Sequence, residues 1–262
     1  MVSMIMGVYN GTLTVRDAIE SIIEQSYKDW ELIVCDDAST DDTFTILKEF
    51  AEKDKRIIVL KNTRNMGLAA TLNKCIKSAN GEYIGRMDCD DISAKNRLEE
   101  QVKFLDSHPE YELVGTLMQE FDEKGKKGII SHKIEPTKYD VPKGAPFFHA
   151  TIVIRTWVIK ALNGYCITKH TIRTEDVDLW YRFFEAGFKG YNLQKILYYV
   201  RVDEKAYRRR KLKYMIHASY IVWKGCGALD LPFYYKIYCI KPILSWLIPP
   251  TVKKRMRQLL IK

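Results

Sequence analysis

The sequence predicts an α/β fold with a mostly parallel sheet, and two observations lead to this prediction. Short apolar runs, typical of buried strands, alternate along the chain with stretches in which apolar residues recur at helical spacing. Four such strand–helix units follow one another within residues 1–108. Because parallel strands need a crossover connection, usually a helix, this alternation favours helices on both faces of the sheet. With 262 residues, 47% of them hydrophobic, the chain can bury the core that such a fold requires.

The first half of the chain supplies these units in a regular order. The first helix is predicted behind a capping box formed by Thr14 and Asp17. The last helix of this half is indicated by an apolar stripe of Leu98, Val102 and Leu105. The predicted strands are residues 2–8, 31–35, 57–60 and 83–87, and the predicted helices begin near residues 15, 40, 68 and 98.

After Pro109 the pattern becomes less regular. We expect strands near residues 113–121 and 151–155, a Gly/Lys turn between them, and a helix at 175–186. This less regular part, residues 109–204, is expected to carry the variable substrate contacts, because such contacts concentrate in loops. We therefore divide the chain into a main domain, residues 1–204, and a C-terminal extension, residues 205–262.

Charge separates this extension from the rest of the chain. The formal net charge is +9, but residues 205–262 hold fourteen Lys or Arg against the single acid Asp230, which leaves residues 1–204 at −4. A basic extension on a mildly acidic body suggests contact with an anionic surface, either a membrane or nucleic acid. We expect a basic amphipathic helix there, with an apolar side made of Leu212, Met215, Ile216, Ser219, Val222 and Trp223.

The cysteines and the apolar segments bear on localisation. Six cysteines occur without a CxxC pair or regular spacing, which favours reduced, buried thiols in a cytoplasmic protein. The start, "MVSMIMGVYN", has neither the basic region nor the cleavage site of a signal peptide, and no run of about twenty apolar residues predicts a membrane span. We therefore expect a cytoplasmic protein that attaches peripherally to the inner face of the plasma membrane.

Polar clusters follow three of the predicted strands. They are Tyr9 and Asn10 after the first strand, residues 36–40 ("DDAST") after the second, and residues 88–91 ("DCDD") after the fourth. In an open α/β sheet the ligand lies outside the carboxyl ends of the strands, so these clusters should converge on one crevice. A GxGxxG loop for direct phosphate binding is missing after the first strand. The carboxylates instead favour a hard divalent cation, Mg²⁺ or Mn²⁺, that bridges phosphate oxygens to the protein.

Simpler roles compete for several of these residues. Ser39, Asp42, Asp91 and Ser93 are placed where they could cap the helices that follow. Tyr9 could be a core residue, although an aromatic ring at a strand end can also stack on a nucleobase. A cap needs only one acid, so Asp88 and Asp90 call for a further explanation.

In these motifs the chain resembles the family 2 glycosyltransferases, which are inverting enzymes of the GT-A fold. The similarity rests on "VYNGTLTVRDAIESIIEQSYKDWELIVCDDASTDDT", on "RNMGLAATLNKCIKSANGEYIGRMDCDDIS", and on "TEDVDLWYRF" further along the chain. It is dense over roughly the first 120 residues. It implies a Rossmann-like GT-A sheet in which residues 1–108 bind a nucleotide-sugar and residues 109–204 bind the acceptor.

The resemblance also implies roles for individual residues. By motif, Tyr9 and Asp37 would hold a uracil-type base, Asp88 would lie near the ribose or the metal, and Asp90 would bind the metal as part of the DXD motif. The catalytic base would be Asp176 of "EDVDLW". Residues expected to line the nucleotide pocket are Gly7, Asn10 and Asn65, although the family usually has proline where this chain has Gly7.

The function implied is transfer of a sugar, with inversion, from a UDP-sugar to a saccharide or lipid-linked saccharide. Such a hexosyl- or N-acetylhexosaminyltransferase would depend on Mn²⁺ or Mg²⁺ and act in the synthesis of bacterial cell-surface polysaccharide. The basic extension would bind an anionic membrane, or else pack on the body as a solvated face. Two alternatives are weaker. A sugar nucleotidyltransferase would need a basic, Gly-rich loop in place of "NGTLTVRD", and nucleic-acid binding would leave the acidic clusters without a role.

Overall fold

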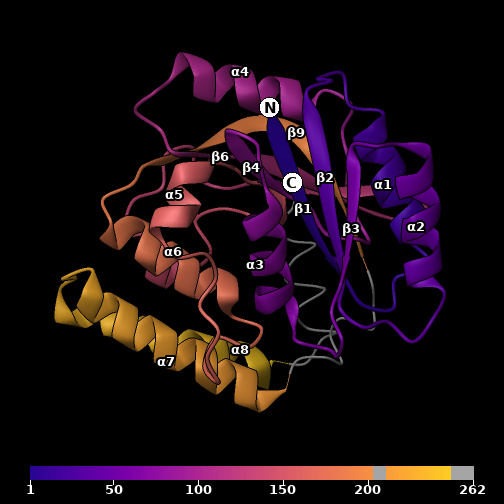
Figure 1. The fold of residues 1–262 in the computed structure, drawn as a ribbon. Coiled ribbons are helices and arrows are strands. Elements are labelled where there is room, and N and C mark those ends of the chain that lie inside the picture. Colours follow the sequence, from indigo (N-terminus) through magenta and orange to yellow (C-terminus); the bar gives the residue numbers. More distant parts are fainter. Residues whose placement is uncertain (203–210, 249–262) are drawn as a thin grey trace.

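A nine-stranded sheet forms the centre of the protein in the computed structural model, which describes residues 1–202 and 211–248 (Figure 1). Eight strands run in the order β3-β2-β1-β4-β8-β6-β9-β5, and β7 pairs with β6 outside this path. The neighbours β3, β2, β1 and β4 are parallel, as the sequence predicts. Antiparallel pairing begins where β8 joins β4. The strands are β1 Val2–Val8, β2 Trp30–Asp36, β3 Ile57–Lys61, β4 Tyr83–Arg86, β5 Ile92–Ser93, β6 Leu113–Asp122, β7 Gly125–Ile130, β8 Val153–Arg155 and β9 Gly190–Arg201.

The helices confirm most of the predicted pattern. In the main domain they are α1 Val15–Ile23, α2 Thr43–Lys53, α3 Leu68–Ser78, α4 Arg97–Ser107, α5 Thr156–Ala161 and α6 Glu175–Glu185, with 3₁₀ turns η1 Val141–Lys143 and η2 His149–Thr151. The prediction of side-chain capping bonds for these helices is wrong. Thr14 and Asp42 stand at the N-caps of α1 and α2 without a side-chain cap bond, and α4 begins after Asn96, beyond Asp91 and Ser93.

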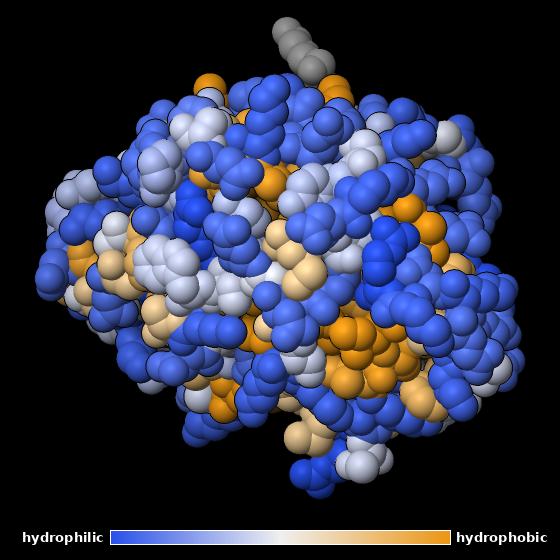
Figure 2. Space-filling model, turned by 45° about the horizontal axis from the view of Figure 1, so that its top comes forward, coloured by the Kyte–Doolittle hydropathy of each residue, from blue (hydrophilic) through white to orange (hydrophobic). Residues whose placement is uncertain are grey.

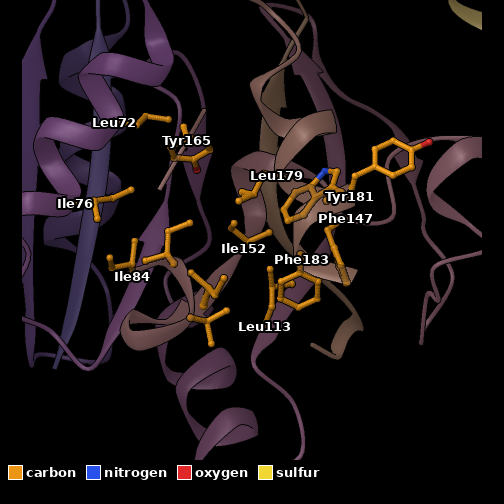
Figure 3. Packing of buried hydrophobic residues seen from close by; sticks show 14 of the residues in the cluster. Leu72, Ile76, Ile84, Leu113, Phe147, Ile152, Tyr165, Leu179, Tyr181 and Phe183 are labelled. Carbon is orange, nitrogen blue, oxygen red and sulfur yellow. The ribbon is translucent and has the colours of Figure 1, made fainter. Parts of the chain in front are cut away.

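Two hydrophobic clusters lie on the two faces of the sheet and hold the layers together. One contains Val15, Ile19 and Ile22 of α1 together with residues of α2 and α4. The other packs α3 and α6 against the opposite face, and Figure 3 shows Leu72 and Ile76 on one side of it and Phe147 and Phe183 on the other. Burial of apolar surface on both faces fixes the sheet, and with it the positions of the strand ends that carry the polar clusters.

The C-terminal extension is helical, as predicted, but it buries a different side. It comprises α7 Leu212–Ala228, η4 Phe233–Ile240 and α8 Lys241–Leu247, and α7 runs along α6 at the bottom of Figure 1. Leu212, Ile216 and Trp223 of the predicted apolar side are exposed. The buried side consists of Ala218, Ile221, Val222, Gly225 and Cys226.

Close packing of small residues explains this difference. A Cβ atom added at Gly225 would lie 2.3 Å from the ring of Tyr181 in α6, so only glycine permits this approach of the two helices. The apolar side of α7 was predicted mainly from its large side chains. The small side chains that allow close contact with α6 were not considered. Within residues 1–202 and 211–248 we find no helix with both the length and the hydropathy to cross a bilayer. The basic run Arg208–Arg210 and the closing "KKRMRQLLIK" lie outside the described residues.

Candidate active site

A pocket of about 780 Å³ lies at the carboxyl ends of the parallel strands. Its lining combines both halves of the main domain. Tyr9 follows β1, Asp37 follows β2, and Asp88 follows β4, which is the arrangement expected from the three polar clusters. The second half adds His149 of η2, the loop before α6, and the start of α6, and Tyr214 of α7 completes the wall.

Asp37 is buried and organises the loop before α3. Its Oδ1 accepts hydrogen bonds from the Asn62 Nδ2 and the Met66 N–H, each at 2.8 Å, and its Oδ2 accepts one from the Gly67 N–H at 2.8 Å. Charge-assisted bonds of this kind are about twice as strong as neutral ones. One lone pair of Oδ2 remains for a ligand, since a carboxylate accepts about four bonds. Asp37 therefore shapes the wall of the pocket that Asn65 and Met66 also line.

The acidic cluster forms one compact set of oxygen atoms. A carboxylate oxygen from each of Asp88, Asp90 and Asp91 lies within 4.8 Å of the others. Asp88 forms a two-pronged ion pair with Arg86, in which the Nη1 to Oδ2 distance is 2.7 Å. Oxygen donors at this spacing fit a hard divalent cation such as Mg²⁺ or Mn²⁺, which prefers carboxylate ligands. Arg86 balances the negative charge of Asp88.

Asp91 has a structural role that differs from the helix cap considered from the sequence. Its Oδ2 accepts a hydrogen bond from the Tyr198 hydroxyl at 2.9 Å, and its Oδ1 accepts one from the Arg201 N–H at 2.8 Å. The same hydroxyl accepts a bond from the Asp88 N–H at 3.1 Å. Burial, together with the charges of Asp88 and Asp90, raises the pKa of Asp91 to about 8. Asp91 thus fastens the acidic cluster to β9.

Arg97 is a fully buried guanidinium group that the sequence analysis missed. Its Nη2 donates to the backbone carbonyls of Arg86, Ala150 and Ile152, and its Nε donates to the Gln101 side chain at 2.9 Å. These bonds join the end of β4 to the segment that carries His149. The spacing of Arg97 and Gln101, one turn apart on the buried side of α4, was the available signal.

Two acids begin α6 and face the pocket. Both Glu175 and Asp176 line it, and burial raises the pKa of each. For Asp176 burial is the largest effect, and it outweighs the hydrogen bond from the Val177 N–H at 2.9 Å and the positive charge of Arg86. A carboxylate with a raised pKa is a stronger base once it is deprotonated.

His149 lines the same pocket as these acids. Its Nε2 is 2.7 Å from the Tyr165 hydroxyl, and burial together with the charge of Arg86 lowers its pKa. Because a neutral imidazole carries one donor and one acceptor, His149 can exchange a hydrogen bond with a polar ligand without adding charge.

The other predicted residues divide into two groups. Tyr9 is 49% exposed and Asn65 is also exposed, and both line the pocket, so Tyr9 is not a core residue. Gly7 and Asn10 are not among the described residues that line it. Gly7 packs on α3, where an added Cβ would lie 3.0 Å from Leu68. Asn10 ties the loops after β1 and β2 together through its N–H to the Ser39 hydroxyl, at 2.9 Å, and its Oδ1 to the Thr40 N–H, at 2.9 Å.

The chain is similar in sequence to proteins named as glycosyltransferases. EpsE of Bacillus subtilis (strain 168), which is named as a glycosyltransferase, is 47% identical over 97% of this chain and 92% of its own length. The Escherichia coli enzyme named UDP-Glc:alpha-D-GlcNAc-diphosphoundecaprenol beta-1,3-glucosyltransferase WfaP is 28% identical over 92% of this chain and 91% of its own.

Solved structures share the fold. That of S. aureus TarS 1–349 with UDP-GlcNAc matches with a TM-score of 0.72 at 19% identity, over 94% of this chain and 71% of TarS 1–349. That of the mannosyltransferase PcManGT from Pyrobaculum calidifontis with GDP-Man and Mn²⁺ matches with a TM-score of 0.65 at 16% identity, over 99% of this chain and 79% of that one.

The sequence profile named Glycosyl transferase family 2 matches residues 3–161, more than half of the chain. The chain therefore belongs to glycosyltransferase family 2, and it is a glycosyltransferase of the GT-A fold.

Proposed function

We propose that the protein transfers a sugar, with inversion, from a UDP-sugar to a lipid-linked saccharide during the synthesis of bacterial cell-surface polysaccharide. The observation that carries this proposal is the position of Asp176, a carboxylate with a raised pKa, in the same pocket as Asp88 and Asp91 of the acidic cluster. The donor class is supported by the UDP-sugar in the TarS structure, and the acceptor class by the name of WfaP. Both are properties of those proteins that we extend to this chain.

Asp176 acts as the general base in this proposal. Its carboxylate accepts the proton of the acceptor hydroxyl while that oxygen attacks the anomeric carbon. The bond from this carbon to the phosphate oxygen breaks on the opposite face, and UDP leaves with the bonding electrons. His149, which lines the same pocket and is hydrogen-bonded to the Tyr165 hydroxyl, orients the acceptor through a hydrogen bond.

The acidic cluster holds the divalent cation, Mn²⁺ or Mg²⁺, through Asp90 and Asp88. When bound, this cation neutralises charge that develops on the diphosphate. The oxygen-only donor set within 4.8 Å fits such an ion. Tyr198 and Arg201 anchor the adjacent Asp91, and Arg86 holds Asp88, so the cluster is positioned before the cation arrives.

The nucleotide lies against the first half of the pocket. The exposed ring of Tyr9 stacks on the nucleobase. Asp37 accepts a hydrogen bond from the same nucleobase through the remaining lone pair of Oδ2. Asn65 contributes to the same wall. Asn10 and Gly7 support this region from outside the lining, through the loop contact with Ser39 and the packing on α3.

We also propose peripheral attachment to the inner face of the cytoplasmic membrane. Figure 2 shows one face of the protein, on which hydrophilic side chains predominate around a hydrophobic patch in the lower half of the view. Eleven of the 21 exposed large hydrophobic side chains in the described part of the chain lie in residues 212–247, including Phe233 and Ile237. Residues 211–247 carry Lys211, Lys213, Lys224, Lys236 and Lys241 against Asp230. Basic groups and amphipathic aromatics together favour the interface of an anionic leaflet.

Co-flotation with anionic vesicles at physiological salt tests this attachment. We expect the wild type to float and a Phe233→Glu, Ile237→Glu double variant to remain in the bottom fraction. Leu13→Glu, which places a charge on a 95% exposed apolar side chain of the main domain, is the matched control and should float. A wild type that stays at the bottom would reject the attachment.

A thermal-shift panel of nucleotide-sugars with Mn²⁺ tests the donor class. A ligand that binds only the native state raises the melting temperature, by linkage. We expect at least one UDP-sugar to raise it, and a smaller rise when the chelator EDTA replaces Mn²⁺. If every UDP-sugar leaves the melting temperature unchanged while a GDP-sugar raises it, the donor class is wrong.

A further inference from the structure

Arg173 stands out among the residues that line the pocket. Of the two arginines in the lining, Arg86 is paired with Asp88, whereas the described residues place no carboxylate within ion-pair distance of Arg173. The Arg173 side chain is exposed, and its guanidinium lies 5.6 Å from the centre of the Tyr214 ring. An unpaired guanidinium on an aromatic face is suited to bind an anion, because it presents a planar set of donors.

The backbone of Arg173 is unusual as well. Its φ is +62°, in the left-handed region that side chains other than Asn, Asp and Gly rarely adopt. Such conformations cost free energy and cluster at functional sites. The loop is held from both sides, since the Thr174 hydroxyl donates to the His170 carbonyl at 2.8 Å and the Thr168 N–H donates to the Thr171 hydroxyl at 2.8 Å. These bonds fix the loop, and they hold Arg173 next to the start of α6, two residues before Glu175.

The surroundings of Arg173 are apolar and basic. Ile167 and Ile172 line the same side of the pocket and are 62% and 53% exposed. Lys213 lies 5.0 Å from the centre of the Tyr214 ring, so two cations flank one aromatic side chain. Ile216, in the next turn of α7, is 51% exposed. This part of the pocket therefore combines unpaired positive charge with apolar side chains open to solvent.

We infer that this rim binds the lipid diphosphate of the acceptor, with Arg173 on the diphosphate and the exposed isoleucines on the first units of the lipid. The inference rests on the proposed function and deepens it by placing the two ends of the acceptor. The saccharide lies toward Asp176, and the diphosphate lies at the rim next to α7. Lys213 contributes a second positive charge. The segment that we propose to meet the membrane begins at this rim, which is where a lipid-borne acceptor would enter.

Farnesyl diphosphate and farnesol provide the probes for this rim. They share an isoprenoid chain and differ in the diphosphate, and their binding to the enzyme saturated with UDP and Mn²⁺ is measured by calorimetry. We expect wild type to bind farnesyl diphosphate more tightly than farnesol. The variant Arg173→Asn, which introduces a residue that tolerates the left-handed backbone, should weaken farnesyl diphosphate binding by roughly 10-fold and leave farnesol binding unchanged.

Two controls make this test specific. Arg173→Lys keeps the charge and should retain most of the affinity, and Arg16→Asn removes an exposed arginine that pairs with Glu49 outside the pocket lining and should have no effect. Equal binding of the two probes to wild type, or unchanged farnesyl diphosphate binding by Arg173→Asn, would overturn the inference.

Anionic vesicles distinguish the acceptor diphosphate from a phospholipid headgroup. If Arg173→Asn lowers flotation with vesicles but leaves farnesyl diphosphate binding intact, the rim binds headgroups and the assignment to the acceptor is wrong. These measurements do not depend on sugar transfer. A failure of the proposed donor class would appear instead as the absence of UDP-sugar binding in the thermal-shift panel.

Discussion

The two halves of the pocket satisfy their polar groups in different ways. On the side formed by residues 1–108, the carboxylate of Asp37 accepts three hydrogen bonds and Asp88 is paired with Arg86. On the side formed by the loop before α6 and by α7, Arg173 has no carboxylate partner among the described residues, and apolar side chains are exposed. The first side is organised by its own contacts, whereas the second leaves groups for a partner. This contrast fits a constant nucleotide on one side and a specific acceptor on the other.

Asp176→Asn should give the largest effect and should separate the two sides most clearly. Removal of a general base costs roughly 10²- to 10⁴-fold in rate. We therefore expect kcat to fall by this factor while the thermal shift produced by UDP stays near the wild-type value. Asp178→Asn is the matched control, because Asp178 lies in the same helix but pairs with Arg182 at 2.7 Å and is not among the lining residues. Equal activity of the Asp176→Asn variant and the wild-type enzyme would remove Asp176 as the base.

Asp90→Ala should weaken metal binding on the nucleotide side of the pocket and thereby lower activity. Loss of a carboxylate ligand, or removal of the cation by a chelator, should lower activity by roughly 100-fold, since a metal ion supplies several kcal/mol of charge stabilisation. Mn²⁺ binding, followed by calorimetry without any sugar, gives a readout that is independent of transfer. Full activity in the presence of chelator would contradict the proposed role of the acidic cluster.

Asp37→Ala should weaken binding of the nucleotide-sugar without affecting the general base, Asp176. Three hydrogen-bond donors, from Asn62, Met66 and Gly67, would lose their acceptor. An unsatisfied buried donor costs about 1–3 kcal/mol, so we expect a lower melting temperature together with a KM for the donor raised by roughly 10-fold. Asp41→Ala, in the same loop but outside the pocket lining, serves as the control for KM. An unchanged donor KM would limit Asp37 to a structural role.

Tyr198→Phe should give the smallest effect and test how the two sides are joined. Its hydroxyl bridges the Asp91 carboxylate and the Asp88 N–H, so β9 of the second half contacts the acidic cluster of the first. Loss of these bonds should lower the free energy of unfolding by about 1–3 kcal/mol and weaken Mn²⁺ binding several-fold. Tyr199→Phe, the neighbour on the same strand, is the control. Unchanged Mn²⁺ binding would show that the acidic cluster is positioned without this bridge.

The sequence predicted the secondary structure of the first half of the main domain better than that of the second half. The strands β1 to β4 and their helices are continuous apolar or periodic segments, and local periodicity was enough to find them. The strand β9 was missed because it mixes polar residues such as Asn192, Gln194 and Lys195 and pairs with the distant β6 through irregular register. The short β7 was read as a turn, since its Lys and Gly residues have little strand propensity.

The site shows the same limit. The ends of the predicted strands placed Tyr9, Asp37 and Asp88 at one crevice, and the family resemblance added Asp176; all four line the pocket. The hydrogen bond between Asp91 and Tyr198 joins residues 107 positions apart, and no local pattern contains such a pairing. Arg173 was also missed. Its proposed role in anion binding rests on its backbone conformation and on the absence of a carboxylate partner among the described residues, and both are properties of the folded chain.

The anomeric configuration of the product tests the central claim most directly. Once the panel has identified a donor, proton NMR of the disaccharide linkage formed by the wild type gives the coupling constant at the transferred anomeric carbon. A single displacement with Asp176 as base predicts a β-linkage from an α-linked UDP-sugar. An α-linkage from the same donor, meaning retention, would contradict the mechanism proposed for this pocket.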